Sequence, residues 1–489
     1  MLWVLSVGWP TARFLTRDAN ETLVLGSSLQ EVLTTVKEDK AQYPTIELSY
    51  SQTRPLATPV VVTLPQNGIR LRFDGPDQRL RLIEVMDFGR TKLAYKGSEL
   101  VKKQEEGASF KRIYQLFGAS FPGEYIPPQS GRTGTYVLSW PGVAFNFALQ
   151  HSGWSPEKDH VSLLGSHAAS SASHMAIFDG NSWPEVRSQL FVKPVPGYRT
   201  PALAAQLRDA LPSEIEMALL ERPGQLTLIR RAPALPLLMV LGQTSPQDLI
   251  TELGAPDAVH KRDTHNLSEE PSHSRPRENS RSLSNGRTHA TPPSSYSSTG
   301  TDTFDTDFDS GDAEDENAER SGREKFWCYF SHGMDILVGP PSDQTSVEEN
   351  NAPMTPLASS SHLVVLKVVM HGNVPGSYAF NRHRRLRWLL KLSNASSDLS
   401  SEHAFDEIKP DLMQAFQGIW PESEMGRGKV VNRTWGAHPS DSSFFLPDAD
   451  QDLVEGGGSE HIDNSKLYHL PGLTFEVLSN GAVSALTVS

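Results

Sequence analysis

Four stretches of the chain share one pattern, a glycine followed by apolar residues at every second position. They are residues 68–73, 142–147, 333–338 and 472–477. A period of two places these apolar side chains on one face of a β-strand. In residues 325–338 an aromatic run precedes a turn at His332 and Gly333, which predicts a β-hairpin with one buried face. The recurrence indicates that one structural unit is used several times.

A short amphipathic helix is predicted next to each of these strands. Apolar residues recur at helical spacing in residues 29–36, 110–117, 245–253 and 405–416. Ser28 and Ser245 stand where helix-capping residues belong, and Gly254 is placed to end the third helix. Pro410 interrupts the fourth pattern, so this helix is predicted to be kinked or to start later. The fold class is therefore α+β, with divergent repeated units of one short amphipathic helix plus an antiparallel β-meander or hairpin.

These units divide the chain as follows. Two helix-plus-meander units occupy residues 1–150, a β-rich middle segment 151–241, a third unit 242–392, and a C-terminal unit with a long loop and a closing hairpin 393–489. Residues 362–371 are apolar at consecutive positions, which predicts a strand buried on both faces. Asn67 and Gly68 predict a two-residue hairpin turn between strands at 60–64 and 69–73. A further strand is predicted at 190–195, and polar loops at 393–402 and 423–464. The insertion at about residues 260–323 is almost free of apolar residues and is predicted to be disordered.

Composition narrows the function further. The chain has 489 residues and a net charge of −13, which argues against a general nucleic-acid binder. Cys328 is the single cysteine, so neither a disulfide framework nor a multi-cysteine zinc site is expected, and a reducing compartment suits the chain. The N-terminal apolar run is short and broken by Pro10, and no stretch is long enough for a transmembrane segment. We expect a soluble intracellular protein whose first residues form a strand.

Three groups of residues resemble parts of known sites. Asp305, Asp307, Asp309 and Glu316 match positions of a calcium-binding loop, but Ser310 stands where that loop requires glycine, so a solvated acidic stretch is expected. Cys328 and His332 form a candidate nucleophile and base, with a buried cysteine and a turn histidine as the alternative. The third group is a set of histidines spaced by seven without carboxylates at ligand spacing: His160, His167 and His174. We predict no catalytic, cofactor or metal site, and hence a protein that is not an enzyme.

The most suggestive functional segment is basic and aromatic. It contains Arg382, Arg384, Arg385, Arg387, Trp388 and Lys391. Such a cluster is typical of a surface that binds a phosphoinositide-containing membrane or an acidic partner. In the alternative interpretation, the arginines lie on an exposed strand edge and pair with carboxylates of the same protein.

Several segments, taken in order, are similar to one family. They read IELSYSQTRPL (46–56), NGIRLRFD (67–74), QRLRLIEV (78–85), LFG and FPG (116–123), YFSHGMDIL (329–337) and HGNVPGSYAFN (371–381). On these segments the chain resembles the phagosome assembly factor 1 (MYTHO) family over nearly its whole length. The long insertion, the loop before Leu473 and the arginines after Asn381 go beyond the family pattern.

The resemblance implies a non-enzymatic cytoplasmic protein without a cofactor. It would be recruited to the preautophagosomal structure and act with a WD-repeat β-propeller partner of the breast-carcinoma-amplified-sequence type. Our first hypothesis is therefore an adaptor or complex subunit in autophagy. The alternatives are a peripheral protein that binds anionic membrane lipid, a factor in transport from the Golgi to the plasma membrane, and an unrecognised enzyme whose polar groups converge from distant segments.

Overall fold

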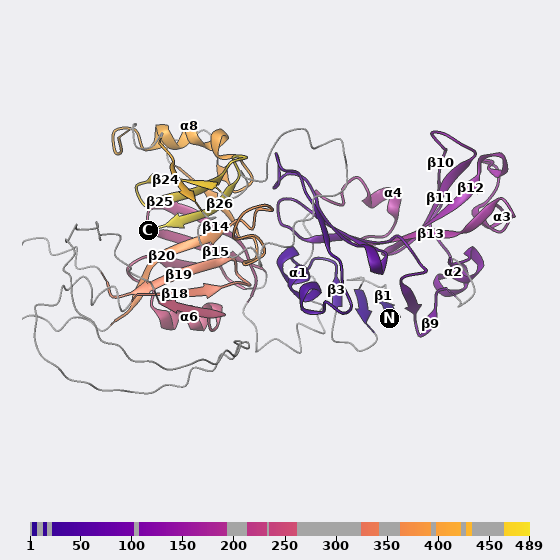
Figure 1. Ribbon diagram of the computed structural model, residues 1–489, viewed down its shortest axis with the longest axis horizontal. Helices are drawn as coiled ribbons and strands as arrows, with labels where there is room; N and C mark the ends of the chain where they lie inside the picture. The colour runs from indigo at the N-terminus through magenta and orange to yellow at the C-terminus, as the bar shows by residue number, and fades with distance from the viewer. Residues whose placement is uncertain are drawn as a thin grey trace, which may run out of the picture. The chain divides into compact units, whose positions relative to one another are not determined.

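The computed structural model describes residues 2–6, 13–16, 22–101, 107–192, 213–231, 234–261, 324–341, 362–392, 398–421, 427–432 and 464–489. The predicted insertion at 260–323 falls almost wholly outside these residues, and the calcium-like acidic run does so entirely. Met1–His260 and Lys325–Ser489 belong to one structural unit. Its described part is an α+β structure of four mainly antiparallel sheets with a few short helices, which confirms the predicted fold class (Figure 1).

The first half of the chain contributes two of these sheets. The five-stranded sheet has the order β3 (Thr22–Val24), β2 (Arg13–Thr16), β1 (Leu2–Ser6), β8 (Lys92–Tyr95) and β9 (Ser98–Glu99). The eight-stranded sheet has the order β10 (Glu124–Ile126), β11 (Thr133–Trp140), β12 (Val143–Gln150), β13 (Ala169–Phe178), β7 (Leu80–Val85), β6 (Ile69–Phe73), β5 (Val60–Leu64) and β4 (Glu47–Ser49). Its helices are α1 (Leu29–Glu38), α2 (Phe110–Phe117), α3 (His160–Leu164) and α4 (Trp183–Val186).

The second half repeats both strand orders. Its five-stranded sheet runs β16 (Leu237–Val240), β15 (Gln225–Arg230), β14 (Ile215–Arg222), β21 (Arg387–Leu390) and β22 (Leu399–Ser400). Its eight-stranded sheet runs β17 (Ala258–Lys261), β18 (Lys325–Tyr329), β19 (Met334–Gly339), β20 (Val364–His371), β26 (Val483–Val488), β25 (Leu473–Leu478), β24 (Asn464–Leu470) and β23 (Lys429–Asn432). Its helices include α6 (Pro246–Leu253) and α8 (Phe405–Ala415).

The two halves correspond element by element. In each five-stranded sheet one pair is parallel, β1 with β8 and β14 with β21. In each eight-stranded sheet two antiparallel meanders join edge to edge, through β13 with β7 and through β20 with β26. The four glycines of the recurrent sequence pattern immediately precede β6, β12, β19 and β25, and all four have a positive φ between 64° and 80°. The sequence pattern located these four strands, but it did not reveal the order of the strands in the sheets.

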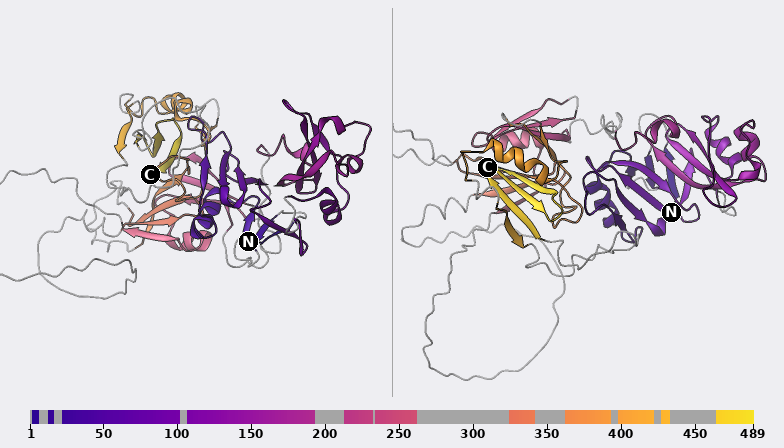
Figure 2. Two further views of the ribbon diagram at one scale, coloured as in Figure 1. Left: turned by 45° about the vertical axis from the view of Figure 1, so that its right-hand side comes forward. Right: turned by 90° about the horizontal axis from the view of Figure 1, so that it is seen from above.

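Each half has its own apolar core, and the helices pack on it with the side chains that the periodicity predicts. Leu29, Val32 and Leu33 of α1 are buried in the first core, and Leu249 of α6 and Ile408 of α8 in the second. In Figure 1, α6 lies beside β18 and β19 and α8 beside β24–β26; the right-hand view of Figure 2 shows the orange helix α8 against the yellow C-terminal strands. Helix burial of this kind contributes more to stability than intrinsic propensity does.

The predicted helix ends are found as well. The Ser28 hydroxyl accepts a hydrogen bond from the Glu31 amide at 3.2 Å, which caps α1. Ser245 and Asp248 form a reciprocal capping box at the start of α6. Gly254, with a φ of 83°, ends that helix.

Other local predictions were wrong. β5 and β6 are joined by a 3₁₀ turn at Pro65–Asn67 followed by Gly68, and not by a two-residue hairpin turn. β20 is not buried on both faces, because partly exposed side chains, Lys367 among them, alternate with buried ones along its second part. α8 begins at Phe405 and continues through Pro410. β22 and β23 lie in stretches that were predicted to be loops, and residues 190–192 form a turn where a strand was predicted.

Candidate functional site

The basic segment that was predicted to be a binding surface connects β20 to β21 and continues into β21. β21 pairs in parallel with β14, with Leu389 opposite Leu219. Trp388 is 3% exposed, and its ring meets that of Phe475 at 6.0 Å in an edge-to-face arrangement. Trp388 is therefore part of the second core and is not an anchor for a membrane.

Glu214 gathers three arginines from both halves of the chain. Its Oε1 lies 2.8 Å from Nη1 of Arg384 and 2.6 Å from Nη2 of Arg79, and its Oε2 lies 2.9 Å from Nη1 of Arg231. Burial would raise the pKa of Glu214, but the charges of Arg384 and Arg79 outweigh burial and lower it from 4.5 to about 2. Glu214 is thus ionised throughout the physiological pH range.

Arg385 is more deeply buried still and bonds mainly to backbone carbonyls. It donates to the carbonyl oxygens of Pro76 at 2.6 Å, Gly372 at 2.8 Å and Ser401 at 3.2 Å. Burial lowers the pKa of Arg385 to about 10, which leaves the guanidinium charged at neutral pH. Because Pro76 lies in the first half and the other two in the second, this side chain holds the halves together.

Arg387 completes the cluster with two ion pairs. Its Nη1 lies 2.9 Å from Asp77 of the first half, and its Nε lies 2.7 Å from Glu402 of the second. We call the set of Arg79, Arg384, Arg385, Arg387, Asp77, Glu214 and Glu402 the arginine junction. The pairs of Arg79 and Arg384 with Glu214 are buried, and a buried pair costs far more when one partner is removed than the intact pair contributes. The junction therefore fixes which surfaces meet.

Neutral contacts extend the junction. The amide of Gln78 donates to the carbonyl of Asn373 at 2.8 Å, and the amide of Asn373 donates to Oε1 of Gln78 at 2.8 Å, although the two residues are 295 positions apart. Beside them Leu56, Val374 and Ala482 form a small apolar cluster. The contact between the halves is therefore a mixed polar and apolar interface.

The prediction of an exposed basic patch is consequently wrong for most of its members. Arg384 and Arg385 are only 7% and 3% exposed, and Arg387 is paired with two carboxylates. These side chains bind groups of the same protein and do not face solvent as a patch. The alternative interpretation is correct about pairing with the protein's own carboxylates, but not about an exposed strand edge. Only Arg382 and Lys391 remain exposed, and Lys391 pairs with Glu221 at 2.9 Å.

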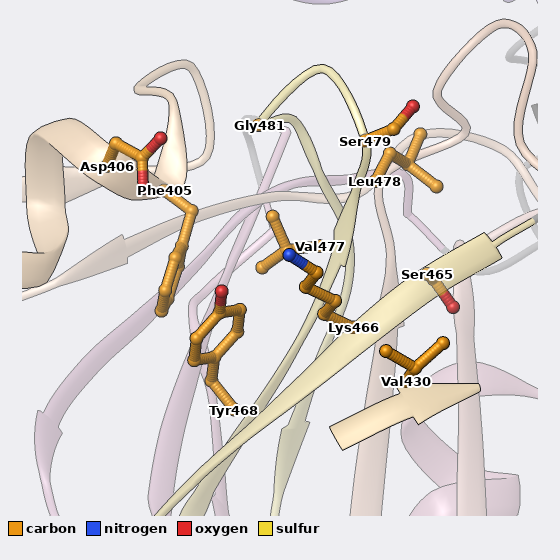
Figure 3. A pocket seen from close by; sticks show the side chains of 10 residues that line it. All are labelled: Phe405, Asp406, Val430, Ser465, Lys466, Tyr468, Val477, Leu478, Ser479 and Gly481. Atoms are coloured by element: carbon orange, nitrogen blue, oxygen red, sulfur yellow. The ribbon is translucent and has the colours of Figure 1, made fainter. Parts of the chain in front are cut away.

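A pocket of about 390 Å³ lies between the start of α8 and the strands β23, β24 and β25 (Figure 3). Ten residues line it: Phe405, Asp406, Val430, Ser465, Lys466, Tyr468, Val477, Leu478, Ser479 and Gly481. The rings of Phe405 and Tyr468 meet at 4.3 Å, and Figure 3 shows them side by side at one end of the pocket. Asp406 and Lys466 are the charged residues of this lining, and the hydroxyl of Ser465 donates to Oε1 of Glu476 at 2.7 Å.

The candidate catalytic pair of Cys328 and His332 lies in the core. Both residues are 6% exposed, and Nε2 of His332 is 3.4 Å from the carbonyl oxygen of Leu253. Burial, together with the nearby Asp335 carboxylate, raises the pKa of the Cys328 thiol to about 12. A thiol that stays protonated is a poor nucleophile, so the structural interpretation of this pair is the better one.

The three histidines spaced by seven do not converge on one point. His160 begins α3 and bonds to Ser120, whereas His174 lies on β13 and bonds to Ser173. Within the described ranges, a different set is the one group of three or more ligand-type side chains close enough to share an ion, namely Asp335, His371 and His383. The side chains that could share a metal ion are therefore not the histidines spaced by seven that the sequence analysis considered.

This aspartate–histidine group joins three segments of the second half. Oδ2 of Asp335 lies 2.9 Å from Nε2 of His371, and Oδ1 lies 2.8 Å from Nε2 of His383. The two imidazole rings stack at 3.8 Å with an interplanar angle of 12°. Burial would raise the pKa of Asp335, but the two histidine hydrogen bonds outweigh it and keep this pKa well below its usual range.

One signal could have pointed to this group. Asp335 and His371 both lie inside segments that carried the family resemblance, and His383 follows the second segment by two residues. No spacing rule joins them, because β19 and β20 are separated by a long connection and His383 comes from a loop. The pairing of β19 with β20 brings Asp335 and His371 together, and the loop before β21 adds His383.

The fold and the arginine junction define an α+β protein of two corresponding halves. The chain belongs to the phagosome assembly factor 1 family, whose sequence model matches residues 20–285 and 309–489. This match covers elements of both halves and confirms the resemblance seen in the sequence.

Relatives from a plant, an insect and a nematode carry the same family name. The PHAF1 protein At3g51130 of Arabidopsis thaliana is 22% identical over 95% of this chain and 89% of its own length. The PHAF1 protein CG7083 of Drosophila melanogaster is 29% identical over 34% of this chain and 37% of its own length. The PHAF1 protein T01G9.2 of Caenorhabditis elegans is 30% identical over 25% of this chain and 28% of its own length. No solved structure matches the chain.

Among the residues that the structure describes, no helix combines the length and the apolar character that crossing a bilayer requires.

Proposed function

We propose that this protein is a non-enzymatic adaptor, or a subunit of a complex, that acts in phagosome assembly during autophagy. The observation that carries the proposal is the family match, which extends over both halves of the chain. The family is named for an assembly role and not for a reaction. We place the protein in the cytoplasm and at the forming autophagosome, together with a WD-repeat β-propeller partner of the breast-carcinoma-amplified-sequence type.

The arginine junction supports a role as a scaffold. It uses buried guanidinium groups to hold two sheet-rich halves in one arrangement, as the contacts of Arg385 with Pro76 and Gly372 illustrate. A rigid body of this kind can present two distant surfaces to a partner at fixed geometry. The junction therefore fits an assembly factor better than a protein that needs these arginines for membrane lipids.

The outer strands of the sheets offer surfaces for a partner. Exposed apolar side chains lie on four strands at sheet ends: Ile126 on β10, Val259 on β17, Val430 on β23 and Leu238 on β16. A strand at the end of a sheet has unpaired backbone groups that another chain can bind. We propose that the WD-repeat partner docks along one of these strands, and β23 beside the pocket of Figure 3 is the first to test.

Affinity purification of the full tagged chain from fed and starved cells tests the proposal. We expect a large WD-repeat protein at a near-stoichiometric level, and less of it with Val430→Glu. Val161→Glu is the matched control, because Val161 is also exposed but lies on the short helix α3. Recovery of the tagged protein alone under both conditions would contradict the adaptor function. Equal partner recovery with both variants would contradict docking at β23 only.

A further inference from the structure

We propose that Asp335, His371 and His383 bind a divalent transition-metal ion, with Zn²⁺ as the representative. The three side chains come from β19, from the last residue of β20 and from the loop before β21. Their ligand atoms all lie within 4.8 Å of one another. Nothing in the assembly role of the family calls for such a site, so this inference is independent of the proposed function.

The donor set matches the chemistry of such an ion. Two imidazole nitrogens and one carboxylate oxygen are ligands that Zn²⁺ uses, at bond lengths of about 2.0–2.2 Å. With these bonds and a tetrahedral arrangement, neighbouring ligand atoms lie roughly 3.3 Å apart. The present separations of 2.9 Å and 2.8 Å run to the two different oxygens of Asp335, and the three ligand atoms lie within 4.8 Å of one another. Binding therefore requires the side chains to rotate until both Nε2 atoms and one oxygen face a common point.

The positions of the imidazole protons also permit binding of the ion. Each Nε2 must offer its lone pair to the ion, so in a neutral ring the proton moves to Nδ1. Nδ1 of His383 is buried and has no hydrogen-bond partner among the described residues, so no contact at that atom fixes the ring in the other tautomer. The ion then takes the place that the two Nε2 protons held beside the Asp335 carboxylate. Because each ring keeps its proton on Nδ1, neutral imidazoles release no proton on binding.

Access to the group is open on one side. The side chains of Asp335 and His371 are 19% and 15% exposed, whereas His383 is 3% exposed. An ion can therefore enter from solvent and keep a water molecule as its fourth ligand, as metal sites with three protein ligands do. Cys328 lies directly opposite Asp335 in the pairing of β18 with β19, but its sulfur is not among the ligand atoms of this group.

The fold does not require this group of side chains. β6 and β7 of the first half correspond to β19 and β20, and the pairs Ile69–Val85 and Met334–Met370 occupy the same register position. By this register Arg70 takes the place of Asp335, and Met86 takes the place of His371. The same strand order thus forms without the aspartate and the histidine at these two positions, which argues that they serve something other than sheet formation.

The test uses the full chain after treatment with a chelator. Titration with Zn²⁺ in a calorimeter should give one ion per chain, and Co²⁺ should give the intense visible absorption of a tetrahedral site. His371→Gln and Asp335→Asn should each weaken binding by tenfold or more and remove the Co²⁺ absorption. His469→Gln, which changes an exposed histidine on β24, is the matched control and should bind as the wild type does.

Two results would overturn the proposal. In the first, the wild-type chain binds no stoichiometric Zn²⁺ and shows only the weak absorption of hydrated Co²⁺, a result that needs no variant to fold. In the second, folded His371→Gln with an unchanged melting temperature binds as the wild type does. Either outcome would leave Asp335 as a hydrogen-bond acceptor that holds the loop before β21.

Discussion

The two eight-stranded sheets have the same strand order, yet corresponding strands carry different polar side chains. In the first half, Arg72 of β6 pairs with Glu84 of β7 at 2.9 Å, an ordinary cross-strand ion pair. In the second half, Asp335 of β19 instead receives His371 from β20 and His383 from a loop. The comparison teaches that the fold sets where polar groups meet, whereas their chemistry is free to diverge.

The halves also differ in how they use their connections. In the first half a short turn joins β6 to β7, and its residues Asp77, Gln78 and Arg79 all contact the second half. In the second half the contacting residues come from the loop between β20 and β21, which supplies Asn373 and the buried arginines. Within the described residues, the turn between β6 and β7 thus contacts the loop between β20 and β21, which is not its counterpart in the second half.

The largest effect is expected from Glu214→Gln. Arg79 and Arg384 would keep buried charges without their shared carboxylate, which costs about 3–5 kcal/mol of unfolding free energy. Urea denaturation measures this loss. Glu216→Gln is the matched control, because Glu216 is half-exposed and pairs only at the edge of the cluster, so its change should stay below about 1 kcal/mol. Equal losses for both variants would show that Glu214 does not organise the junction.

The pH dependence of the unfolding free energy should also reveal the contribution of the Glu214 carboxylate. The pKa of Glu214 is lower in the folded state, so its contribution is fully present above pH 4.5 and is lost as the pH falls through about 2. The contribution amounts to about 3 kcal/mol at neutral pH. The difference in unfolding free energy between wild type and Glu214→Gln should therefore shrink steadily over this window. A difference that stays constant from pH 7 to pH 2 would contradict the assignment.

Two glycines of the recurrent pattern, Gly333 before β19 and Gly472 before β25, allow a comparison with a smaller expected loss of stability. A methyl group on Gly333 would come within 2.3 Å of the Arg384 carbonyl oxygen, whereas on Gly472 it would meet nothing closer than 3.5 Å. Both have a φ of 77°, so both alanine variants pay the same backbone strain of about 1–2 kcal/mol. Gly333→Ala should lose about 1–3 kcal/mol more, because the junction loop must move. Thermal denaturation of the two variants checks this, and equal losses would mean that the loop gives way freely.

The smallest effect is expected where the basic segment is exposed. Arg382→Glu with Lys391→Glu should leave the melting temperature unchanged, since neither side chain belongs to the arginine junction. Flotation with vesicles that contain anionic lipid should recover neither the wild type nor this variant in the absence of a partner. Strong flotation of the wild type that this double variant abolishes would instead support direct lipid binding.

Periodicity was enough to locate most strands and helices, because side-chain burial repeats along each element. It predicted the hairpin of β18 and β19 and the capped helix α6 correctly. It could not show that β13 joins β7 or that β1 pairs in parallel with β8, since edge pairing leaves no periodic signal. β22 has only two residues, too few for any alternation to be detected.

The site was harder to predict for a related reason. A run of arginines looks the same in a sequence whether it faces a membrane or carboxylates from a distant segment. Arg384 meets Glu214 across 170 positions of the sequence, and Arg387 meets Asp77 across 310. The aspartate–histidine group was missed because strand pairing, and not sequence spacing, brings its members together.

A double-mutant cycle between Arg79 and Glu214 tests most directly whether the arginine junction joins the two halves. The measurement is the unfolding free energy of the wild type, Arg79→Met, Glu214→Gln and the double variant. Because the two side chains are in contact at 2.6 Å and come from different halves, we predict a coupling of about 1–3 kcal/mol. Additive losses, with no coupling, would contradict a structure in which the halves meet through these buried charges.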